Sequence, residues 1–171
     1  MSIDAQKLNG LVDAELQRLT DERVKAHIQR LRVEPIVVMR AWDYGLENER
    51  YPCWTVLRHD RFRTDIAFCE YGFGPKHPWG LVSTSADEPG GSMGMDSAWY
   101  DTFLEAVFES SAVTDLPIWR VFKTETAGSK QPHAISAEGE WDATWAKVMA
   151  LREADPANRY DCSTSVQYKW K

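Results

Sequence analysis

The sequence predicts an α+β fold, in which a mainly antiparallel sheet of five or six strands packs with three or four helices. Apolar residues recur at helical spacing in three separate segments, and short runs rich in β-branched and aromatic residues lie between them. The 171 residues contain no internal repeat, no low-complexity tract and no clear domain boundary, and 125–139 is expected to be a linker within the domain. We therefore expect one domain over 1–171, with a helical segment at 4–32 and the sheet with its helices over 35–171.

The N-terminal segment from Asp4 to Leu31 has helical spacing. Thr20 is suited to cap a second helix, so the segment forms either one long helix or two helices with a break near Thr20 and Asp21. Pro35 closes the segment, because the residue before a proline is pushed out of the helical conformation. The recurring apolar positions are Leu8, Leu11, Val12, Leu16, Leu19, Val24, Ile28 and Leu31.

Six further segments have the composition or alternation of strands. The connection between the second and third is short and polar, which predicts an antiparallel hairpin. The polar segment 43–50 is expected to be a loop, and the last strand alternates apolar and polar residues as a half-buried strand does. The expected strands are 36–42, 53–59, 65–71, 79–83, 116–124 and 160–170.

Two more helices are expected, over 96–109 and 140–153. In the first, Asp96 or Ser97 is suited to the N-cap, and the apolar residues from Trp99 to Phe108 share one broad arc. Asp101, Glu105 and Glu109 are spaced four residues apart outside that arc, so they are predicted to form an acidic stripe. An ordinary solvated helix face explains such a row, but no basic residue relieves the repulsion along it, which adds some weight to a role in binding.

Composition narrows the classes of function. The net charge of −6 and the isoelectric point near 5.2 disfavour a nucleic-acid-binding protein, because affinity for phosphate backbones comes from clustered lysine and arginine. There is no apolar run of 18 residues and no basic, apolar N-terminal signal, so we expect a cytoplasmic protein without a membrane span. The eight tryptophans suit core packing and also binding surfaces.

The chemistry-bearing residues do not form a recognisable site. Cys53 and Cys69, taken with His59 and His77, lack both a nucleophile signature and the close pairing typical of metal ligands. Cysteines inside strand patterns are better explained as reduced, apolar core residues. His27 and His133 are expected to be exposed. The sequence therefore predicts no catalytic, cofactor-binding or metal-binding residue.

Four short stretches resemble bacterial immunity proteins of the polymorphic-toxin type. The stretches are YPCWTVL at 51–57, EYGFGP at 70–75, PWGLV at 78–82 and MGMDSAWY at 93–100. The resemblance extends from Tyr51 to Pro117 and lies in tryptophan-rich strands, acidity and a glycine-rich loop before an acidic helix. It implies a small cytosolic domain that binds and silences a cognate toxin, and it assigns no functional residue.

Three hypotheses about function follow. The first is a non-enzymatic, acidic immunity protein that binds a basic toxin such as a nuclease through Asp101, Glu105 and Glu109, together with Asp87 and Glu88. The alternative is a small enzyme or ligand-binding domain with a pocket near loops 72–80 and 86–94, where Cys69 and His77 would converge. The third is a scaffold subunit that self-associates. The sequence leaves the partner's identity and the oligomeric state open.

Overall fold

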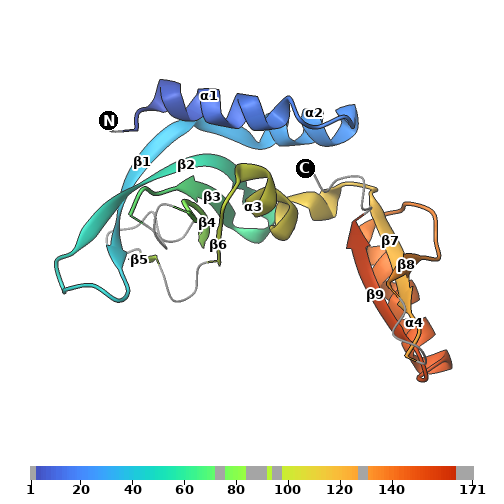
Figure 1. The fold of residues 1–171 in the computed structure, drawn as a ribbon. Coiled ribbons are helices and arrows are strands. Elements are labelled where there is room, and N and C mark those ends of the chain that lie inside the picture. The colour runs from blue at the N-terminus through green and yellow to red at the C-terminus, as the bar shows by residue number, and fades with distance from the viewer. Residues whose placement is uncertain (1–2, 72–75, 84–91, 94–97, 127–130, 165–171) are drawn as a thin grey trace. The chain divides into compact units, whose positions relative to one another are not determined.

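The computed structural model describes residues 3–71, 76–83, 92–93, 98–126 and 131–164. The chain divides into two compact units, Met1–Val113 and Thr114–Lys171, which are described separately below (Figure 1). The predicted α+β class, with four helices and mainly antiparallel pairing, is confirmed. No helix among the described residues is long and apolar enough to cross a membrane.

The first unit begins with two helices, α1 (Ala5–Leu16) and α2 (Glu22–Leu31), so the two-helix alternative holds. The carboxylate of Asp21, and not the hydroxyl of Thr20, caps α2 by accepting from the Arg23 amide at 2.8 Å. Strand β1 (Arg32–Trp42) follows at once. Pro35 lies inside β1, four residues beyond the end of α2 at Leu31, where the register shifts between Arg32 and Ile36 and a missing amide costs little.

A six-stranded sheet forms the centre of this unit, in the order β5-β1-β2-β3-β4-β6. Its other strands are β2 (Arg50–His59), β3 (Thr64–Phe68), β4 (Trp79–Ser83), β5 (Ser92–Met93) and β6 (Ala98–Tyr100). The predicted antiparallel pairing of β2 with β3 is confirmed, across the short 3-10 turn Asp60–Phe62. Within the part of the chain that the structure describes, β5 alone pairs in parallel, with Ala41 and Trp42 of β1.

The helix predicted over 96–109 is wrong in its first half. Helix α3 spans Phe103–Glu109 with Thr102 as its N-cap, while Trp99 and Tyr100 belong to β6. Trp99 pairs with Gly80 of β4, and its ring lies where a side chain at Gly80 would be, within 2.8 Å of a Cβ placed there. Strand pairing with a residue that has no side chain therefore overrides the local helical pattern. Asp96 and Ser97 lie outside the described residues.

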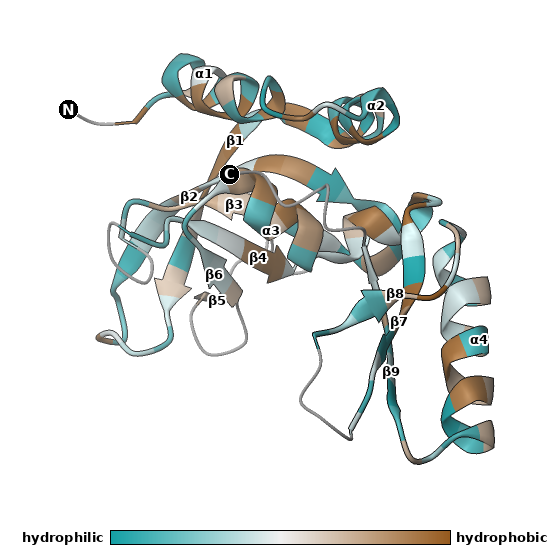
Figure 2. Ribbon diagram, turned by 45° about the vertical axis from the view of Figure 1, so that its right-hand side comes forward, coloured by the Kyte–Doolittle hydropathy of each residue, from teal (hydrophilic) through white to brown (hydrophobic). Residues whose placement is uncertain are grey.

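The sheet buries different groups on its two faces. Phe68 and Phe103 both pack against Trp79, with ring centroids 5.1 and 5.2 Å away, so the face of Phe68 is the face that α3 covers. Helix α1 contacts α3 and β1, and α2 contacts β2. Figure 2 shows brown, apolar residues on the side of α1 that is turned to the sheet. Because side chains alternate along a strand, Ala67 and Cys69 point to the opposite face.

The second unit has its own three-stranded antiparallel sheet, in the order β8-β7-β9. Its strands are β7 (Trp119–Thr124), β8 (His133–Ala134) and β9 (Arg159–Thr164), and helix α4 (Trp141–Ala154) packs on β7 and β9. A 3-10 segment, Ser111–Asp115, precedes it. The buried residues Val121, Val148 and Tyr160 form its core. The predicted strand 160–170 is observed up to Thr164, beyond which the structure describes no residue.

Candidate partner-binding surfaces

The acidic stripe predicted on one helix is divided between two kinds of structure. Asp101 precedes the N-cap Thr102 and forms an ion pair with His77, so it does not belong to the helical row. Glu105 is half-buried in the first turn of α3, and Glu109 is exposed in its last turn. Asp87 and Glu88 lie outside the described residues. The stripe therefore has only two members on α3.

The negative charges of Glu105 and Glu109 act on Tyr100. The pKa of Tyr100 is raised, first by burial and then by the charges of Glu109 and Glu105. Most large apolar side chains of α3 are taken up by the core, since Phe103, Leu104 and Val107 are fully buried and Phe108 is half-buried. This surface therefore presents negative charge to a partner but few exposed apolar side chains.

Helix α3 is held from α1 by the side chain of Glu15. Its carboxylate accepts hydrogen bonds from the amides of Phe103, at 3.0 Å, and Leu104, at 2.9 Å. Free amides in a first helical turn need acceptors, and a negative charge there also suits the helix dipole. Glu15 of α1 therefore has a structural role, because its carboxylate holds the first turn of α3.

A second surface lies at the connection of β1 with β2, at residues 43–49, which we name the hairpin tip. The sequence predicts a polar loop here, yet Tyr44 is 60% exposed and Leu46 is 82% exposed. The ring of Tyr44 packs edge-on against Trp42, with centroids 5.5 Å apart. Glu47 is exposed beside them. The hairpin tip therefore presents both apolar and acidic side chains to solvent.

Hydrogen bonds centred on Glu49 fix the shape of the hairpin tip. Its carboxylate accepts from the amide of Leu46, at 2.9 Å, and from the hydroxyl of Tyr51. Its own amide donates to the carbonyl of Leu46 at 2.8 Å. The hydroxyl of Tyr51 first, and then the amide of Leu46, lower the pKa of Glu49. The turn is therefore built around an ionised carboxylate.

Gly45 is required by this packing. A Cβ at Gly45 would lie 2.5 Å from Oε2 of Glu49 and 2.9 Å from Cδ1 of Trp42. The amide of Gly45 also donates to the carbonyl of Trp42 at 3.0 Å. The closed turn leaves no room for a side chain between Glu49 and Trp42, which explains a glycine in this position.

Exposed apolar residues continue from the hairpin tip along β1. Ile36, Val37 and Met39 are each about half exposed, at 49%, 47% and 52%. Among the described residues, β5 pairs with β1 only at Ala41 and Trp42. Ile36, Val37 and Met39 thus lie where β1 has no described strand beside it opposite β2, and exposed apolar residues at such an edge favour contact with another chain. Sequence reasoning missed this surface, although the alternation of Tyr44 and Leu46 with polar residues is visible in the sequence.

The cysteine and histidine residues do not converge as a nucleophile and its base. Cys53 and Cys69 are fully buried, while His59 bonds to the Ser111 hydroxyl at 3.1 Å and His77 pairs with Asp101. The hydrogen bond that the two thiols share, with burial as the second cause, raises the pKa of Cys53 far above its usual range. The same hydrogen bond lowers the pKa of Cys69.

His27 is buried, not exposed as the sequence predicts. Its Nε2 donates to the carbonyl of Ala112 at 2.7 Å, and its Nδ1 accepts from Arg30 at 2.8 Å. A guanidinium has no acceptor atom, so this pair of contacts defines the tautomer. His27 therefore joins α2 to the segment after α3, and it is a core residue.

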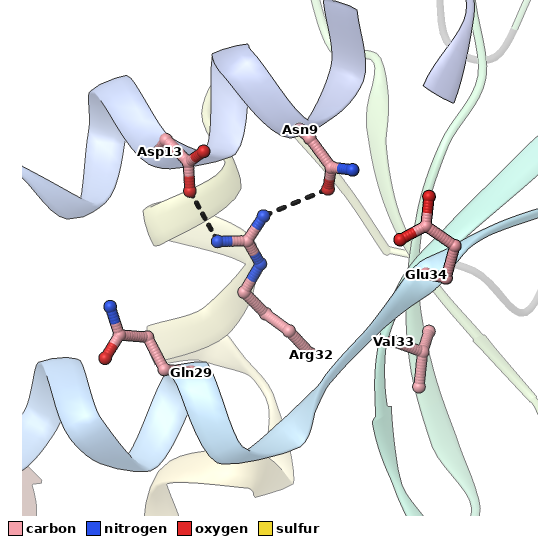
Figure 3. Close-up of a pocket in the computed structure, with 6 residues that line it drawn as sticks. All are labelled: Asn9, Asp13, Gln29, Arg32, Val33 and Glu34. Atoms are coloured by element: carbon pink, nitrogen blue, oxygen red, sulfur yellow. Dashed lines mark hydrogen bonds and ion pairs between the residues drawn. The ribbon is translucent and has the colours of Figure 1, made fainter. Parts of the chain in front are cut away.

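A polar pocket of about 430 Å³ lies between α1 and the junction of α2 with β1 (Figure 3). Arg32 dominates it and donates to Asp13 at 2.5 Å and to Asn9 at 3.0 Å. The guanidinium thus already has two acceptors within the protein. The pocket predicted near loops 72–80 and 86–94 stays a prediction, because 72–75, 84–91 and residue 94 lie outside the described residues.

No protein family, curated protein or solved structure matches this chain.

Proposed function

We propose that this chain is a non-enzymatic binding protein that engages another protein through the hairpin tip. The observation that carries the proposal is that Glu49 and Gly45 hold Tyr44 and Leu46 in a fixed, solvent-exposed turn. Exposed apolar side chains gain free energy only when a partner covers them. A turn that is already ordered loses less conformational entropy on binding, which increases affinity.

Charge indicates the kind of partner. The chain carries a net charge of −6, and Glu47 lies beside the exposed apolar residues of the tip. Complementary charge speeds encounter and selects basic partners, while buried apolar anchors supply most of the affinity. Together with the resemblance to immunity proteins, this supports a basic toxin domain as the partner and inhibition by direct binding as the function.

The acidic face of α3 is the second docking surface that we consider. It comprises Asp101, Glu105 and Glu109, and Asp87 and Glu88 remain proposed members. Its apolar neighbours are mostly buried, so its contribution would be steering by charge. Such a contribution falls as salt concentration rises, because exposed charges are screened.

Co-expression with the product of the adjacent reading frame, followed by affinity purification, tests the function. We expect a stable complex with a basic protein whose toxicity is suppressed. A partner-binding assay then separates the surfaces by comparing Tyr44→Ala/Leu46→Ala with Asp101→Lys/Glu105→Lys/Glu109→Lys. Truncation of interface anchors costs about 2 kcal/mol or more, so the tip variant should bind at least about 30-fold more weakly.

The triple charge reversal should reduce the association rate and leave dissociation nearly unchanged. If the tip variant binds as tightly as the unaltered protein while the charge reversal abolishes binding, the interface belongs to α3. Failure to bind any neighbouring gene product, or a homodimer that buries the hairpin tip, would contradict the proposed function itself.

A further inference from the structure

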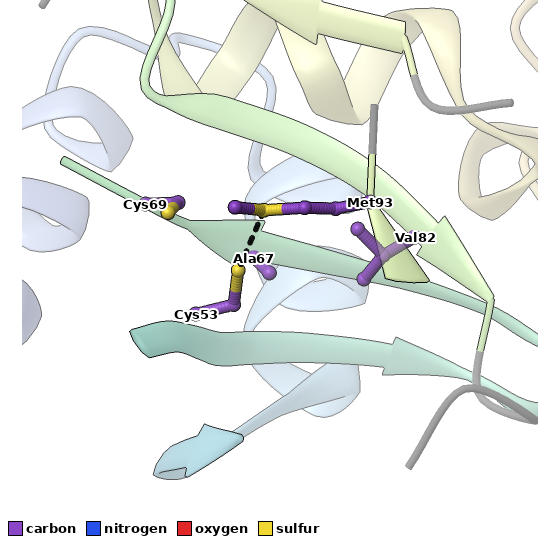
Figure 4. Close-up of a cluster of buried hydrophobic side chains, with 5 residues drawn as sticks. All are labelled: Cys53, Ala67, Cys69, Val82 and Met93. Atoms are coloured by element: carbon purple, nitrogen blue, oxygen red, sulfur yellow. Dashed lines mark hydrogen bonds between the residues drawn. The ribbon is translucent and has the colours of Figure 1, made fainter. Parts of the chain in front are cut away.

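Three sulfur-bearing side chains meet on the face of the six-stranded sheet opposite α3. They are Cys53 of β2, Cys69 just after β3 and Met93 of β5, and none is more than 1% exposed. The thiol of Cys53 donates to the sulfur of Met93 at 3.1 Å (Figure 4). Residues far apart in the sequence thus bring thiol and thioether groups together in the buried interior.

The strand register places the two cysteines directly opposite each other. Trp54 pairs with Phe68, so the next pair is Cys53 with Cys69. The amide of Cys69 donates to the carbonyl of Pro78 at 2.8 Å, away from β2. The two cysteines are therefore a non-hydrogen-bonded pair across β2 and β3, in which Cα atoms lie about 4.5 Å apart and side chains are closest.

The donor set selects a particular class of metal ion. Thiolate and thioether ligands are soft and prefer Cu(I), whereas structural zinc sites need four nitrogen or sulfur ligands. Among the residues that the structure describes, no three His, Cys, Asp or Glu side chains gather as a potential metal site. Cys53, Cys69 and Met93 together thus suit an ion with a low coordination number. They lack the oxygen and nitrogen ligands that divalent ions such as Mg²⁺, Ca²⁺ and Mn²⁺ require.

Arg40 supplies a charge that suits this ion. Its side chain is fully buried, and the strand register pairs Val38 with Cys53 and Arg40 with Tyr51. Because alternate residues of a strand share a face, Arg40 and Cys53 lie on the same face of the sheet. One monovalent ion bound to two thiolates carries a net charge of −1, which is costly in an apolar interior unless a positive charge lies near. Arg40 is positioned to offset that charge.

We propose that Cys53, Cys69 and Met93 form a binding site for one Cu(I) ion. Binding replaces two thiol protons by the ion and releases both protons to solvent, and no atom changes its oxidation state. The inference is independent of the proposed partner binding, because none of the three residues belongs to the hairpin tip.

The test uses the reduced full-length protein, kept without oxygen, in competition with the coloured Cu(I) chelator bicinchoninate. We expect the protein to withdraw one Cu(I) per chain from the chelator, and X-ray absorption to show three sulfur ligands. Cys53→Ala and Cys69→Ala should lose this binding entirely. Cys162→Ala, which changes the remaining, half-buried cysteine, should bind as the unaltered protein does.

Met93→Leu guards against a variant that fails to fold, because it conserves volume and removes only the thioether. This variant should keep the thermal unfolding of the metal-free protein and show two sulfur ligands in place of three. The proposal is overturned if the chelator keeps all its copper, if Cys53→Ala/Cys69→Ala withdraws copper equally well, or if Met93→Leu leaves the sulfur count unchanged.

Discussion

The hairpin tip and helix α3 use the same residue types with opposite results. Both combine aromatic or aliphatic side chains with carboxylates, but α3 buries Phe103 and Leu104 completely, while the tip leaves Leu46 82% exposed. In α3 the carboxylate of Glu15 serves the helix end, and in the tip the carboxylate of Glu49 holds a turn that exposes apolar groups. What separates a binding surface from a core element is therefore the environment of the apolar side chains.

The largest expected difference between the two regions is in stability. Phe103→Ala removes a fully buried ring packed on Trp79, and such truncations cost about 3–5 kcal/mol. Leu46→Ala removes an exposed side chain and should change the free energy of unfolding by at most about 0.5 kcal/mol. Urea denaturation followed by circular dichroism measures both. Equal losses would show that the tip is part of the core.

The next effect concerns the link between α1 and α3. Glu15→Ala removes the acceptor of two amides, at 3.0 and 2.9 Å, and leaves them without that partner. A hydrogen bond to a charged group contributes about 1.5–3 kcal/mol. Because both amides are only partly buried and water replaces part of what they lose, we expect a total loss of about 2–3 kcal/mol in the same denaturation assay. Glu109→Ala, at an exposed position of α3, is the matched control and should be nearly neutral. A neutral Glu15→Ala would contradict this structural role.

Local patterns predicted most of the elements. Strand β4 has the predicted bounds of 79–83, because a short apolar run between turn residues has few other conformations. Trp99 and Tyr100 were placed wrongly because their helical spacing continues that of α3, whereas Gly80 on another strand decides their structure. The separate sheet of β7, β8 and β9 was also missed, since alternation identifies a strand without naming its neighbour.

The candidate site was less accessible to sequence reasoning than the fold. The predicted acidic stripe requires Asp101 to lie on the helix. The helix instead begins after its N-cap Thr102, so Asp101 lies before it. The hairpin tip has a polar average composition, so its exposed Tyr44 and Leu46 do not stand out. His27 lies on a charged helix, and its contact with Ala112, 85 residues away, decides its burial. The burial of His27 thus depends on a long-range contact, whereas the N-terminal end of α3 and the hairpin tip depend on side-chain hydrogen bonds between residues two or three positions apart.

A smaller effect tests whether the shape of the tip matters. Gly45→Ala forces Glu49 or Trp42 to move, since a Cβ would lie 2.5 Å from the Glu49 carboxylate. We expect a local loss of about 1 kcal/mol, seen as faster amide exchange at Leu46, and weaker binding of the proposed partner. The matched control is Gly10→Ala in α1, where nothing lies within 4 Å of an added Cβ. Alanine should stabilise that helix. Unchanged exchange at Leu46 would remove the argument for a preorganised turn.

The smallest effect is the pH dependence of the tip. The pKa of Glu49 in the folded protein is lowered from 4.5, so its stabilising effect is fully present above that value and is lost as the pH falls through the folded pKa. Amide exchange at Leu46, corrected for its intrinsic pH dependence, should therefore accelerate only below pH 4.5. Tyr51→Phe removes the largest cause of the shift and should move the transition to higher pH.

Because neither Asp101 nor Glu109 contacts the turn, their replacement by alanine should leave the transition in place. A transition that follows those residues and not Tyr51 would mean that the charge of the whole surface, and not the Glu49 hydrogen bonds, holds the tip in its exposed conformation.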